Sequence, residues 1–225
     1  MFAKKNNFLL VEGQALAYVQ IDFSSIEEFL ARMSRARRKD IRRKLKSRHL
    51  LDIDVVPIGH VIFEDDRFVN ELYELYLNVY HQSNIHFDKL SESFFKGILR
   101  EKDDSGVVFI YRADGHVIGY NICFIKDDLL IDKYVGFLYP QARQYNLYMV
   151  SWFYNLEYAA ARGLRCYVAG WTDPEIKRYL GASFTLTRHA VYIRNPVLRK
   201  LLGYFKHLFE ADHNWYVNRA VPDNS

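Results

Sequence analysis

Positive charge is concentrated in one short run of the sequence, residues 32–48. The run holds ten Lys and Arg side chains against a single acid, Asp40, so it carries a net charge of +9 while the rest of the chain carries −5. Such a run favours a binding site for phosphate or another anion. A solvated helix face and contact with an acidic membrane surface are the two other interpretations. The side chains that we expect to form this basic patch are Arg37, Arg38, Arg42, Arg43 and Lys46.

The segment around His86 is a second candidate for chemistry. His86 precedes Asp88 by two residues, and a carboxylate at that spacing could orient the imidazole as a general base. The alternative interpretation is that Asp88 caps the helix that follows, with His86 packed beside it.

Common signatures of metal and nucleotide sites are missing from the sequence. Cys123 and Cys166 are 43 residues apart and the eight His are scattered, so we expect no metal. G-x-S-x-G, Walker and Rossmann motifs are absent. Both cysteines lie in apolar runs and no secretory signal opens the chain, which predicts free buried thiols in a cytoplasmic protein. No apolar run approaches the roughly 18 residues of a transmembrane helix.

The stretch Leu129–Ala182 combines polar turns with apolar elements in the order strand, turn, helix, strand, turn, short helix. Turns at the carboxyl ends of strands are common ligand sites in α/β domains. Asp132 and Lys133 alternate on the first strand, so we expect one of them to face a cleft and the other to pack or pair. The residues after the second strand, Trp171, Thr172 and Asp173, either face an acceptor or merely cap the next helix.

Other elements must position these residues. The pattern predicts a hairpin over Phe8–Phe23 with a turn near Gly13, a helix capped by Ser24 or Ser25, and a basic helix held by Ile41 and Leu45. A strand and two helices follow. The next three strands, Val107–Tyr111, Val117–Ile125 and Leu129–Leu138, predict an antiparallel meander. The final elements are a helix Tyr145–Arg162, a strand, a short helix after Asp173-Pro174, a strand Phe184–Arg194 and an amphipathic helix Val197–Phe209.

This order predicts an α+β fold, in which a mixed, mostly antiparallel central sheet is flanked by helices in a three-layer α/β arrangement. We expect one domain over residues 1–225. It comprises a basic helical segment at 24–50, a core at 51–194 and a C-terminal helix at 195–215.

Three sequence segments carry a resemblance to a known family. They are SRARRKDIRRKLKS, IDKYVGFLYPQARQYNLY, and KRYLGA after a strand that ends in Gly170. Together they resemble the GNAT superfamily of N-acyltransferases, and more closely the branch related to Fem-type peptidoglycan aminoacyltransferases. The resemblance covers Ile21 to Arg194. Family members often pair two such domains, so this chain resembles either an excised half or a protein that completes itself as a homodimer.

The resemblance implies roles for two groups of residues. Backbone N–H groups of Tyr134, Val135, Gly136 and Phe137 would polarise the acyl carbonyl, and the turn and helix start at Arg143, Gln144, Tyr145 and Asn146 would receive the donor's phosphate. This turn lacks the family's glycine-rich pattern. Without glycine a backbone cannot approach a pyrophosphate as closely. Arg143 either compensates by charge or is a surface turn residue.

Lys177 occupies the position where many family members carry an acid Tyr, four residues before Gly181. By resemblance to the Fem-type pattern, this Lys would stabilise an oxyanion or a phosphate of a tRNA acceptor end. The alternative is a Lys on the exposed face of a short helix.

These observations predict an N-acyltransferase in which an amine acceptor attacks the donor directly. The donor implied first is acyl-CoA as co-substrate, and the alternative is an aminoacyl-tRNA. Lys177 would steady the departing charge, and Asp132 or His86 would take the amine proton through water. The acceptor would be a small-molecule or peptide amine near Trp171. A second alternative is a non-catalytic module that binds RNA or an acidic membrane through the basic run.

Overall fold

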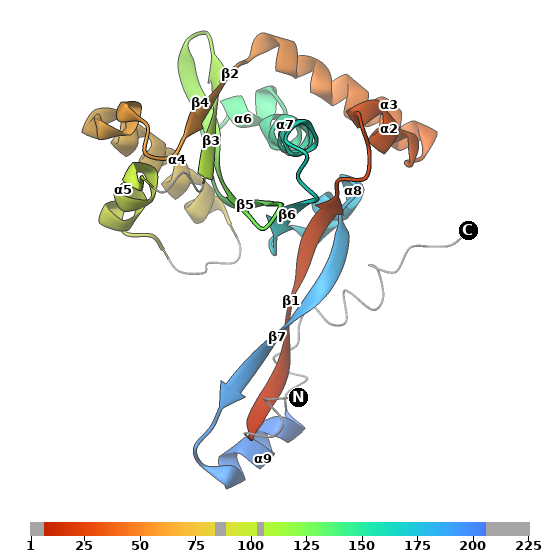
Figure 1. Cartoon of the computed structure of the whole chain (residues 1–225), viewed down its shortest axis with the longest axis vertical. Helices are drawn as coiled ribbons and strands as arrows, with labels where there is room; N and C mark the ends of the chain where they lie inside the picture. Colours follow the sequence, from red (N-terminus) through yellow and green to blue (C-terminus); the bar gives the residue numbers. More distant parts are fainter. Residues whose placement is uncertain (1–6, 84–88, 103–105, 206–225) are drawn as a thin grey trace. The chain divides into compact units, whose positions relative to one another are not determined.

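The computed structural model describes residues 7–83, 89–102 and 106–205, coloured along the chain in Figure 1. These residues form two compact units. The core unit comprises residues 20–168. The ribbon unit is built from the two ends of the described chain, residues 7–19 and 169–205.

Seven strands follow one another in the sheet in the order β2-β3-β4-β5-β6-β1-β7. The pairing of β5 with β6 is parallel, and β1–β7, β2–β3, β3–β4 and β4–β5 are antiparallel. A mostly antiparallel sheet flanked by helices confirms the predicted fold class. The strands are β1 (Phe8–Gln20), β2 (Asp52–Pro57), β3 (Gly106–Ala113), β4 (His116–Lys126), β5 (Leu129–Phe137), β6 (Cys166–Gly170) and β7 (Ser183–Tyr192).

One face of the core unit's sheet is covered by α4 (Asp66–Gln82) and α5 (Glu92–Arg100), as Figure 1 shows. Apolar side chains recur on α4 at helical spacing, and alternate residues of the strands meet them. The shared cluster includes Leu72 and Leu75 of α4, Phe95 of α5, Ile110 of β3 and Tyr120 of β4. The 3₁₀ helix η2 (Val61–Glu64) lies beside both helices through the buried Phe63.

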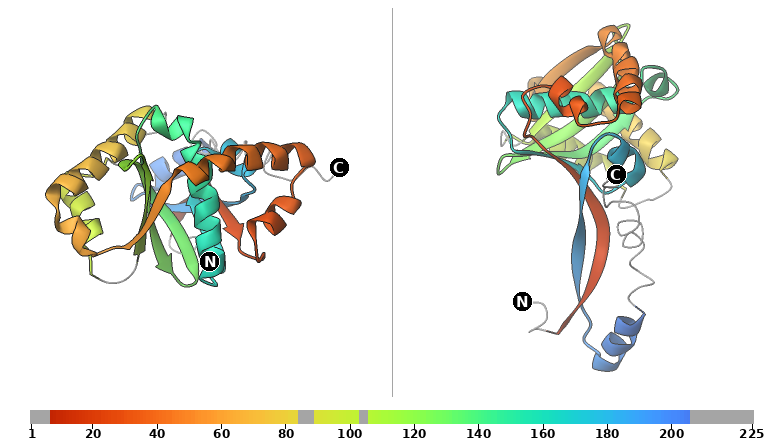
Figure 2. Two further views of the ribbon diagram at one scale, coloured as in Figure 1. Left: turned by 90° about the horizontal axis from the view of Figure 1, so that it is seen from above. Right: turned by 90° about the vertical axis from the view of Figure 1, so that its right-hand side faces the viewer.

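The opposite face of the same sheet packs against α7 (Leu147–Ala161) (Figure 2). Phe109 and Tyr111 point to this side because side chains alternate along β3, and their rings meet Tyr154 of α7 at 5.3 and 6.4 Å between centroids. The N-terminal helix α2 (Ile26–Ala31) also packs here, with Phe29 against Phe153.

The basic segment forms α3 (Arg35–Leu45) followed by the 3₁₀ helix η1 (Lys46–Leu50). Ile41 is the buried residue of α3, and the remaining sides of the helix are charged. Of the two serines that the sequence offered, Ser25 is the N-cap of α2, because its hydroxyl accepts a hydrogen bond from the Glu28 N–H. The Glu28 carboxylate in turn accepts from the N–H of Ser24.

The ribbon unit contains β1 paired with β7, and the helices α8 (Pro174–Tyr179) and α9 (Pro196–Tyr204). The predicted hairpin within Phe8–Phe23 is wrong, because β1 is one continuous strand with a register shift between Glu12 and Ala15. Gly13 lies at that bulge because a Cβ there would stand 2.4 Å from Thr187 Oγ1 and 2.5 Å from His189 Nε2. A close approach, and not a turn, requires this glycine.

Candidate functional site

Strand β5 parts from β6 part-way along its length. The parallel pairing joins Leu129–Ile131 to Cys166–Val168 and covers three residue pairs. On its other edge β5 stays paired with β4 as far as Phe137. Beyond Ile131 one edge of β5 is therefore no longer bonded to β6.

A bulge lies where β5 leaves β6. Cys123 of β4 faces Asp132, but its neighbour Ile122 faces Tyr134, so that Lys133 is the extra residue on β5. One additional residue changes the face to which the following side chains point. Asp132 is hydrogen-bonded inside the core unit, and Lys133 is exposed with its ammonium 5.8 Å from the Tyr134 ring centroid. That one of the two faces a cleft stays a prediction.

The backbone N–H groups of Val135 and Phe137 point away from β4. The N–H of Leu138 donates to the Ile118 carbonyl of β4, and the bonded residues of an antiparallel pair alternate, so the groups at 135 and 137 face the other edge. Consistent with this direction, the carbonyl of Phe137 accepts a hydrogen bond from the Asn78 side chain of α4 at 3.3 Å. These two N–H groups have the orientation needed to bind an acyl carbonyl beside β5.

Gly136 and Tyr134 instead face α4. A Cβ at position 136 would lie 2.3 Å from the Tyr120 ring and 2.9 Å from Leu75 Cβ, so only glycine fits. Tyr134 packs against the same apolar cluster. Of the four predicted carbonyl-binding residues, Val135 and Phe137 therefore have N–H groups at the diverging edge, while Gly136 and Tyr134 hold β5 against α4.

The carboxylate of Asp132 is the acceptor of a polar network under the α7 face. Asn121 Nδ2 donates to both oxygens at 3.1 and 3.0 Å, Asn155 Nδ2 of α7 donates at 3.1 Å, and the Tyr167 hydroxyl of β6 donates at 2.8 Å. Asn121 and Asn155 are almost fully buried. Three side chains from β4, β6 and α7 thus converge on the residue at the bulge, where β5 and β6 part.

The negative charge of Asp132 also affects the pKa values of neighbouring titratable groups. Burial raises the pKa of the Tyr167 hydroxyl well above its usual value, and the negative charge of Asp132 raises it further. Burial likewise raises the pKa of the Cys123 thiol, again reinforced by Asp132. Cys123 and Cys166 are both free and buried, which confirms the prediction made for them. Neither thiol has the features of a nucleophile.

The turn before α7 has a conformation different from a glycine-rich phosphate loop. A one-turn helix, α6 (Gln141–Gln144), follows the cis Tyr139–Pro140 bond, and Asn146 precedes α7 in a left-handed conformation (φ 51°). The backbone N–H groups of residues 143–146 all donate to carbonyls of the turn itself, within Pro140, Gln141 and Arg143. Helix α7 begins at Leu147, two residues after the predicted start. The amides predicted to receive donor phosphate are therefore already hydrogen-bonded.

Two side chains of this turn are exposed, whereas its amides at 143–146 are hydrogen-bonded. Arg143 is exposed, with its guanidinium carbon 5.2 Å from the Tyr139 ring centroid. Gln144 is also exposed. An anion held at residues 143–146 would therefore be bound by side chains.

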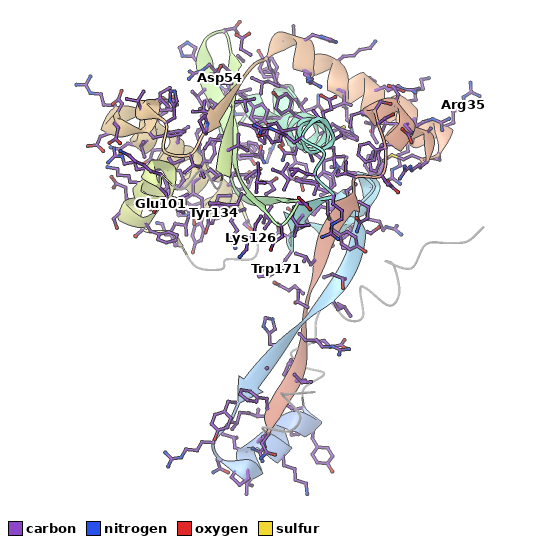
Figure 3. The ribbon with its side chains drawn as sticks, viewed as in Figure 1. Arg35, Asp54, Glu101, Lys126, Tyr134 and Trp171 are labelled. Carbon is purple, nitrogen blue, oxygen red and sulfur yellow. The ribbon has the colours of Figure 1, made fainter. Side chains whose placement is uncertain are left out.

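The basic segment presents four cations in one line. Arg35, Lys39, Arg42 and Lys46 follow one another at spacings of four, three and four residues, which places them on one side of a helix over about 16 Å. Within the described residues Arg35, Lys39 and Lys46 have no ion-pair partner, and all three are exposed. Arg42 pairs with Glu27. We call Arg35, Lys39, Arg42 and Lys46 the cationic stripe, whose first member is labelled in Figure 3.

The predicted patch overlaps with this stripe only in part. Arg42 and Lys46 belong to it, whereas Arg38 donates to the carbonyls of Ala31 and Met33, both at 3.0 Å, and so supports the end of α2. Arg43 pairs with Asp40 at 2.7 Å, and Arg37 is half-buried. Arg35 and Lys39 were missed, although the four-three-four spacing in the sequence indicates them.

Contacts from η1 join the basic segment to α7. The Ser47 hydroxyl donates to the carbonyl of Tyr145, in the turn between α6 and α7. Arg48 pairs with Glu157 at 2.5 Å and lies over the Tyr154 ring, 5.0 Å from its centroid. The C-terminal end of the cationic stripe is thereby fixed next to the turn that the resemblance assigns to the donor.

Lys177, in the ribbon unit, is almost fully buried, with 4% of its surface exposed. Its ammonium donates to the carbonyl of Ala169 at 2.6 Å, near the end of β6. The interpretation as an exposed helix residue is therefore wrong. Burial of an ammonium group lowers stability and is uncommon in proteins, so a buried Lys is a stronger candidate for a functional role than a surface Lys.

The residues before Lys177 have mixed environments. Trp171 is 39% exposed, and its position is labelled in Figure 3. Asp173 is left-handed (φ 52°) at the N-cap of α8 without a side-chain capping bond, so its carboxylate does not serve as the cap. Thr172 is half-buried. His86 lies outside the described residues, and its role stays a prediction.

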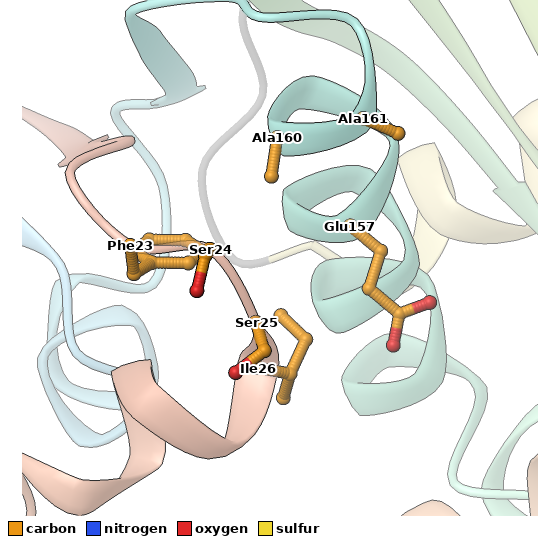
Figure 4. A pocket seen from close by; sticks show the side chains of 7 residues that line it. All are labelled: Phe23, Ser24, Ser25, Ile26, Glu157, Ala160 and Ala161. Atoms are coloured by element: carbon orange, nitrogen blue, oxygen red, sulfur yellow. The ribbon is translucent and has the colours of Figure 1, made fainter.

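A surface pocket of the core unit lies between the start of α2 and the second half of α7 (Figure 4). Its polar side chains are already engaged, since Ser24 and Ser25 belong to the α2 cap and Glu157 pairs with Arg48. Its other lining residues are Phe23, Ile26, Ala160 and Ala161. In the described residues no group of three or more His, Cys, Asp or Glu could hold a metal ion. None of the described helices is both long and apolar enough to cross a bilayer.

Comparison with known proteins agrees with this architecture. A family model described as "Acetyltransferase (GNAT) domain" matches residues 35–178. No curated protein sequence matches the chain. Among solved structures, the C-terminal domain of a protein described as lysylphosphatidylglycerol synthetase from Agrobacterium fabrum is similar with a TM-score of 0.64 at 12% identity. That match covers 93% of this chain and 67% of the other.

Two further solved structures share the fold. The L-PGS of Bacillus licheniformis has a TM-score of 0.62 at 9% identity, covering 91% of this chain and 69% of the other. FemX has a TM-score of 0.61 at 12% identity, covering 88% of this chain and 65% of its own. This chain thus spans about two thirds of the length of each of the three structures.

Proposed function

The chain belongs to the acetyltransferase (GNAT) family, and from that premise we propose that it is an N-acyltransferase whose donor is an aminoacyl-tRNA. The acceptor is an amine, of a small molecule or a peptide. The observation that carries the choice of donor is the turn before α7. Its amides at 143–146 donate to carbonyls of the same turn, so these four N–H groups are not free to bind a CoA pyrophosphate.

The cationic stripe supports the same donor. Four cations in line over about 16 Å match a polyanion with regularly spaced phosphates better than they match one small ligand. Ser47 and Arg48 fix the end of this stripe beside the turn before α7. An RNA bound along the stripe would thus have its backbone neutralised next to the expected donor site.

The reaction is a direct transfer. The acceptor nitrogen attacks the ester carbonyl carbon of the aminoacyl group, the carbonyl oxygen becomes an oxyanion, and the C–O bond to the terminal ribose breaks. The new amide retains the acyl carbon, the ribose oxygen leaves with a proton, and the acceptor nitrogen loses one. N–H groups of Val135 and Phe137 stabilise the oxyanion, because both face the diverging edge of β5.

We assign Lys177 to the negative charge that develops in the transition state. Its ammonium is fixed by the Ala169 carbonyl and largely withdrawn from solvent, which strengthens any electrostatic interaction it makes. Asp132 acts as a positioning residue, since three side chains already donate to its carboxylate. His86 remains our prediction for the general base. Trp171, Thr172 and Asp173 remain our prediction for the acceptor side.

Calorimetry with two ligands tests the donor. Aminoacyl-tRNA is expected to bind with an affinity that falls steeply with salt, and acetyl-CoA is expected to bind weakly or not at all. Lys39→Gln and Lys46→Gln should each reduce the salt slope by about one. Lys89→Gln, outside the basic segment, is the matched control. Tight binding of acetyl-CoA with no binding of tRNA would reject the proposed donor.

An acyl-CoA donor is the second candidate, because the family model that matches the chain describes acetyltransferases. The same titration decides between the two donors. The non-catalytic alternative is tested with Lys177→Met, which keeps most of the side-chain volume and removes the charge. If the protein is a transferase, this variant loses turnover by about 10²–10³-fold while tRNA binding persists. Unchanged turnover in Lys177→Met would remove Lys177 from the mechanism.

A further inference from the structure

An unusual share of the exposed apolar surface lies at one end of the ribbon unit. We define this end, the tip, as residues 7–11 and 189–205. It carries seven of the thirteen large apolar side chains that are exposed in the described residues. Figure 2 shows α9 at this end of the β1–β7 ribbon. The seven are Val191, Tyr192, Val197, Leu198, Leu201, Tyr204 and Phe205.

Helix α9 is held in place with its apolar side outward. The Asn195 side chain caps it by accepting from the N–H groups of Val197 and Leu198, at 2.9 and 3.2 Å. Arg199 donates to the Asn7 carbonyl at 3.2 Å, and a Cβ at Gly203 would be 3.6 Å from Leu9 Cδ1. An Arg and a Gly of α9 thus face residues 7–9, and of its large apolar residues only Leu202 is half-buried, which is unlike the usual amphipathic arrangement.

The exposed side of α9 is one continuous apolar strip. At 100° per residue, four exposed apolar side chains of α9 and that of its C-cap residue cover about 120° of the helix circumference, and Lys200 lies at one margin. The five are Val197, Leu198, Leu201, Tyr204 and Phe205, between 46% and 75% exposed. A strip of this width is what a helix buries against something else.

The charged residues of the tip indicate which kind of partner its apolar strip would bind. Arg194, Arg199 and Lys200 are its cations, and it contains no Asp or Glu. A second copy of the chain would bring these cations against the same cations, which opposes self-association through this face. An apolar helix face bordered only by positive charge matches an anionic lipid surface, where the apolar side chains enter the acyl boundary and the cations meet headgroups.

We propose that the tip binds the surface of an anionic lipid bilayer, with α9 lying in the plane of the interface. At nine residues, α9 is about 14 Å long and cannot span the hydrocarbon core, so binding is peripheral. This surface shares no residue with those assigned to acyl transfer. The proposal for the tip therefore does not depend on which donor the protein uses.

Co-sedimentation of the full chain with vesicles tests this proposal. Binding is expected to phosphatidylcholine vesicles that contain phosphatidylserine, and to decrease with salt and with removal of phosphatidylserine. Leu201→Glu should lower the partition coefficient at least tenfold, because it places a charge in the middle of the apolar strip. Val61→Glu is the matched control, since Val61 is 73% exposed on η2 in the core unit, and its binding should equal that of the wild type.

A second pair of variants separates the tip from the cationic stripe. Lys200→Gln should reduce binding to the phosphatidylserine vesicles about fivefold, the effect of one cation near a charged membrane surface. Lys39→Gln, an exposed Lys of α3, should leave it unchanged. Circular dichroism checks that each variant is folded, which is expected because all four substituted side chains are exposed.

Several results would overturn the proposal. They are no sedimentation with phosphatidylserine vesicles, equal binding to pure phosphatidylcholine, and loss of binding in Lys39→Gln but not in Lys200→Gln. Light scattering, which measures the oligomeric state, tests whether the apolar strip is instead covered by a second copy or by the chain itself. A wild-type dimer that Leu201→Glu converts to a monomer, without vesicle binding, would assign the tip to a second copy. A monomer that ignores vesicles would indicate that the strip is covered within the chain itself.

Discussion

The hydroxyl of Ser47 donates a hydrogen bond to the carbonyl of Tyr145, a residue 98 positions later in the chain. This contact connects the basic segment with the turn before α7, the two parts of the core unit that the donor hypothesis requires to act together. Arg48 strengthens the connection by pairing with Glu157 and lying over Tyr154. Neither contact is unusual in itself, but together they hold the basic segment against the turn before α7 and against α7.

Removal of this hydroxyl should loosen the basic segment. The segment is rich in trypsin sites, and cleavage within a folded protein follows the free energy of local opening. Ser47→Ala should cost about 1 kcal/mol and so raise the rate of cleavage within residues 35–48 about fivefold. Ser93→Ala, which removes an exposed hydroxyl of α5 that lies 3.1 Å from Ser91, is the control and should leave this rate unchanged. Equal rates in the two variants would contradict the anchoring role.

The Asp132 network should contribute measurably to stability. Tyr167→Phe deletes one charge-assisted hydrogen bond of 2.8 Å inside the core unit, and we expect a loss of about 2 kcal/mol in the free energy of unfolding. Tyr158→Phe on α7, whose half-buried ring packs against Phe109, should cost no more than about 0.5 kcal/mol. Urea denaturation measures both variants. If both lose the same stability, the Tyr167 hydroxyl has no special importance for the network.

Gly136 and Gly97 should respond in opposite directions to the same substitution. Gly136→Ala places a methyl group 2.3 Å from the Tyr120 ring and should destabilise the protein by about 1–3 kcal/mol. Gly97 lies within α5, where a Cβ would meet nothing within 4 Å, so Gly97→Ala should stabilise it by about 0.5–1 kcal/mol. Thermal unfolding monitored by circular dichroism would show the two opposite shifts. A neutral Gly136→Ala would mean that β5 and α4 are less closely packed than the structure indicates.

The cysteines should resist modification in the folded protein. The Cys123 thiol is buried and its pKa is raised, so the thiolate that reacts with disulfide reagents is scarce even at mildly alkaline pH. A chromogenic disulfide reagent should therefore detect both thiols in concentrated urea and neither in buffer. Rapid reaction of the native protein would show that the region around Asp132 opens easily.

The fold was within reach of the sequence because its elements have clear periodic patterns. The meander β3–β4–β5 follows from alternating apolar residues and tight turns, and α7 from an apolar run that ends at Gly163. The failure at Gly13 has a physical cause. A glycine between two apolar runs indicates a turn, but here the partner side chains Thr187 and His189 occupy the space of its Cβ. That information lies 174 or more residues away in the chain.

The candidate site was predictable in type but not in detail. The sequence indicated that Lys177 was unusual for its position, yet gave no sign that its ammonium is buried against Ala169. The stripe was recognisable as a basic helix, but Arg38 turned out to bond the end of α2, and no local pattern predicts such a backbone contact. Asp132 was identified as a functional candidate without its partners, because Asn121, Asn155 and Tyr167 come from three different elements.

The pairing of β1 with β7 has a consequence for biosynthesis. Residues 8–20 leave the ribosome well before their partner β7, which begins only at Ser183. At bacterial or eukaryotic rates of translation, the edge of β1 waits about ten seconds or longer for β7. The core unit, residues 20–168, is continuous and is synthesised in full before β7 emerges. During that interval the apolar β1 is a natural substrate for a ribosome-associated chaperone, and stalled chains would expose it to proteases.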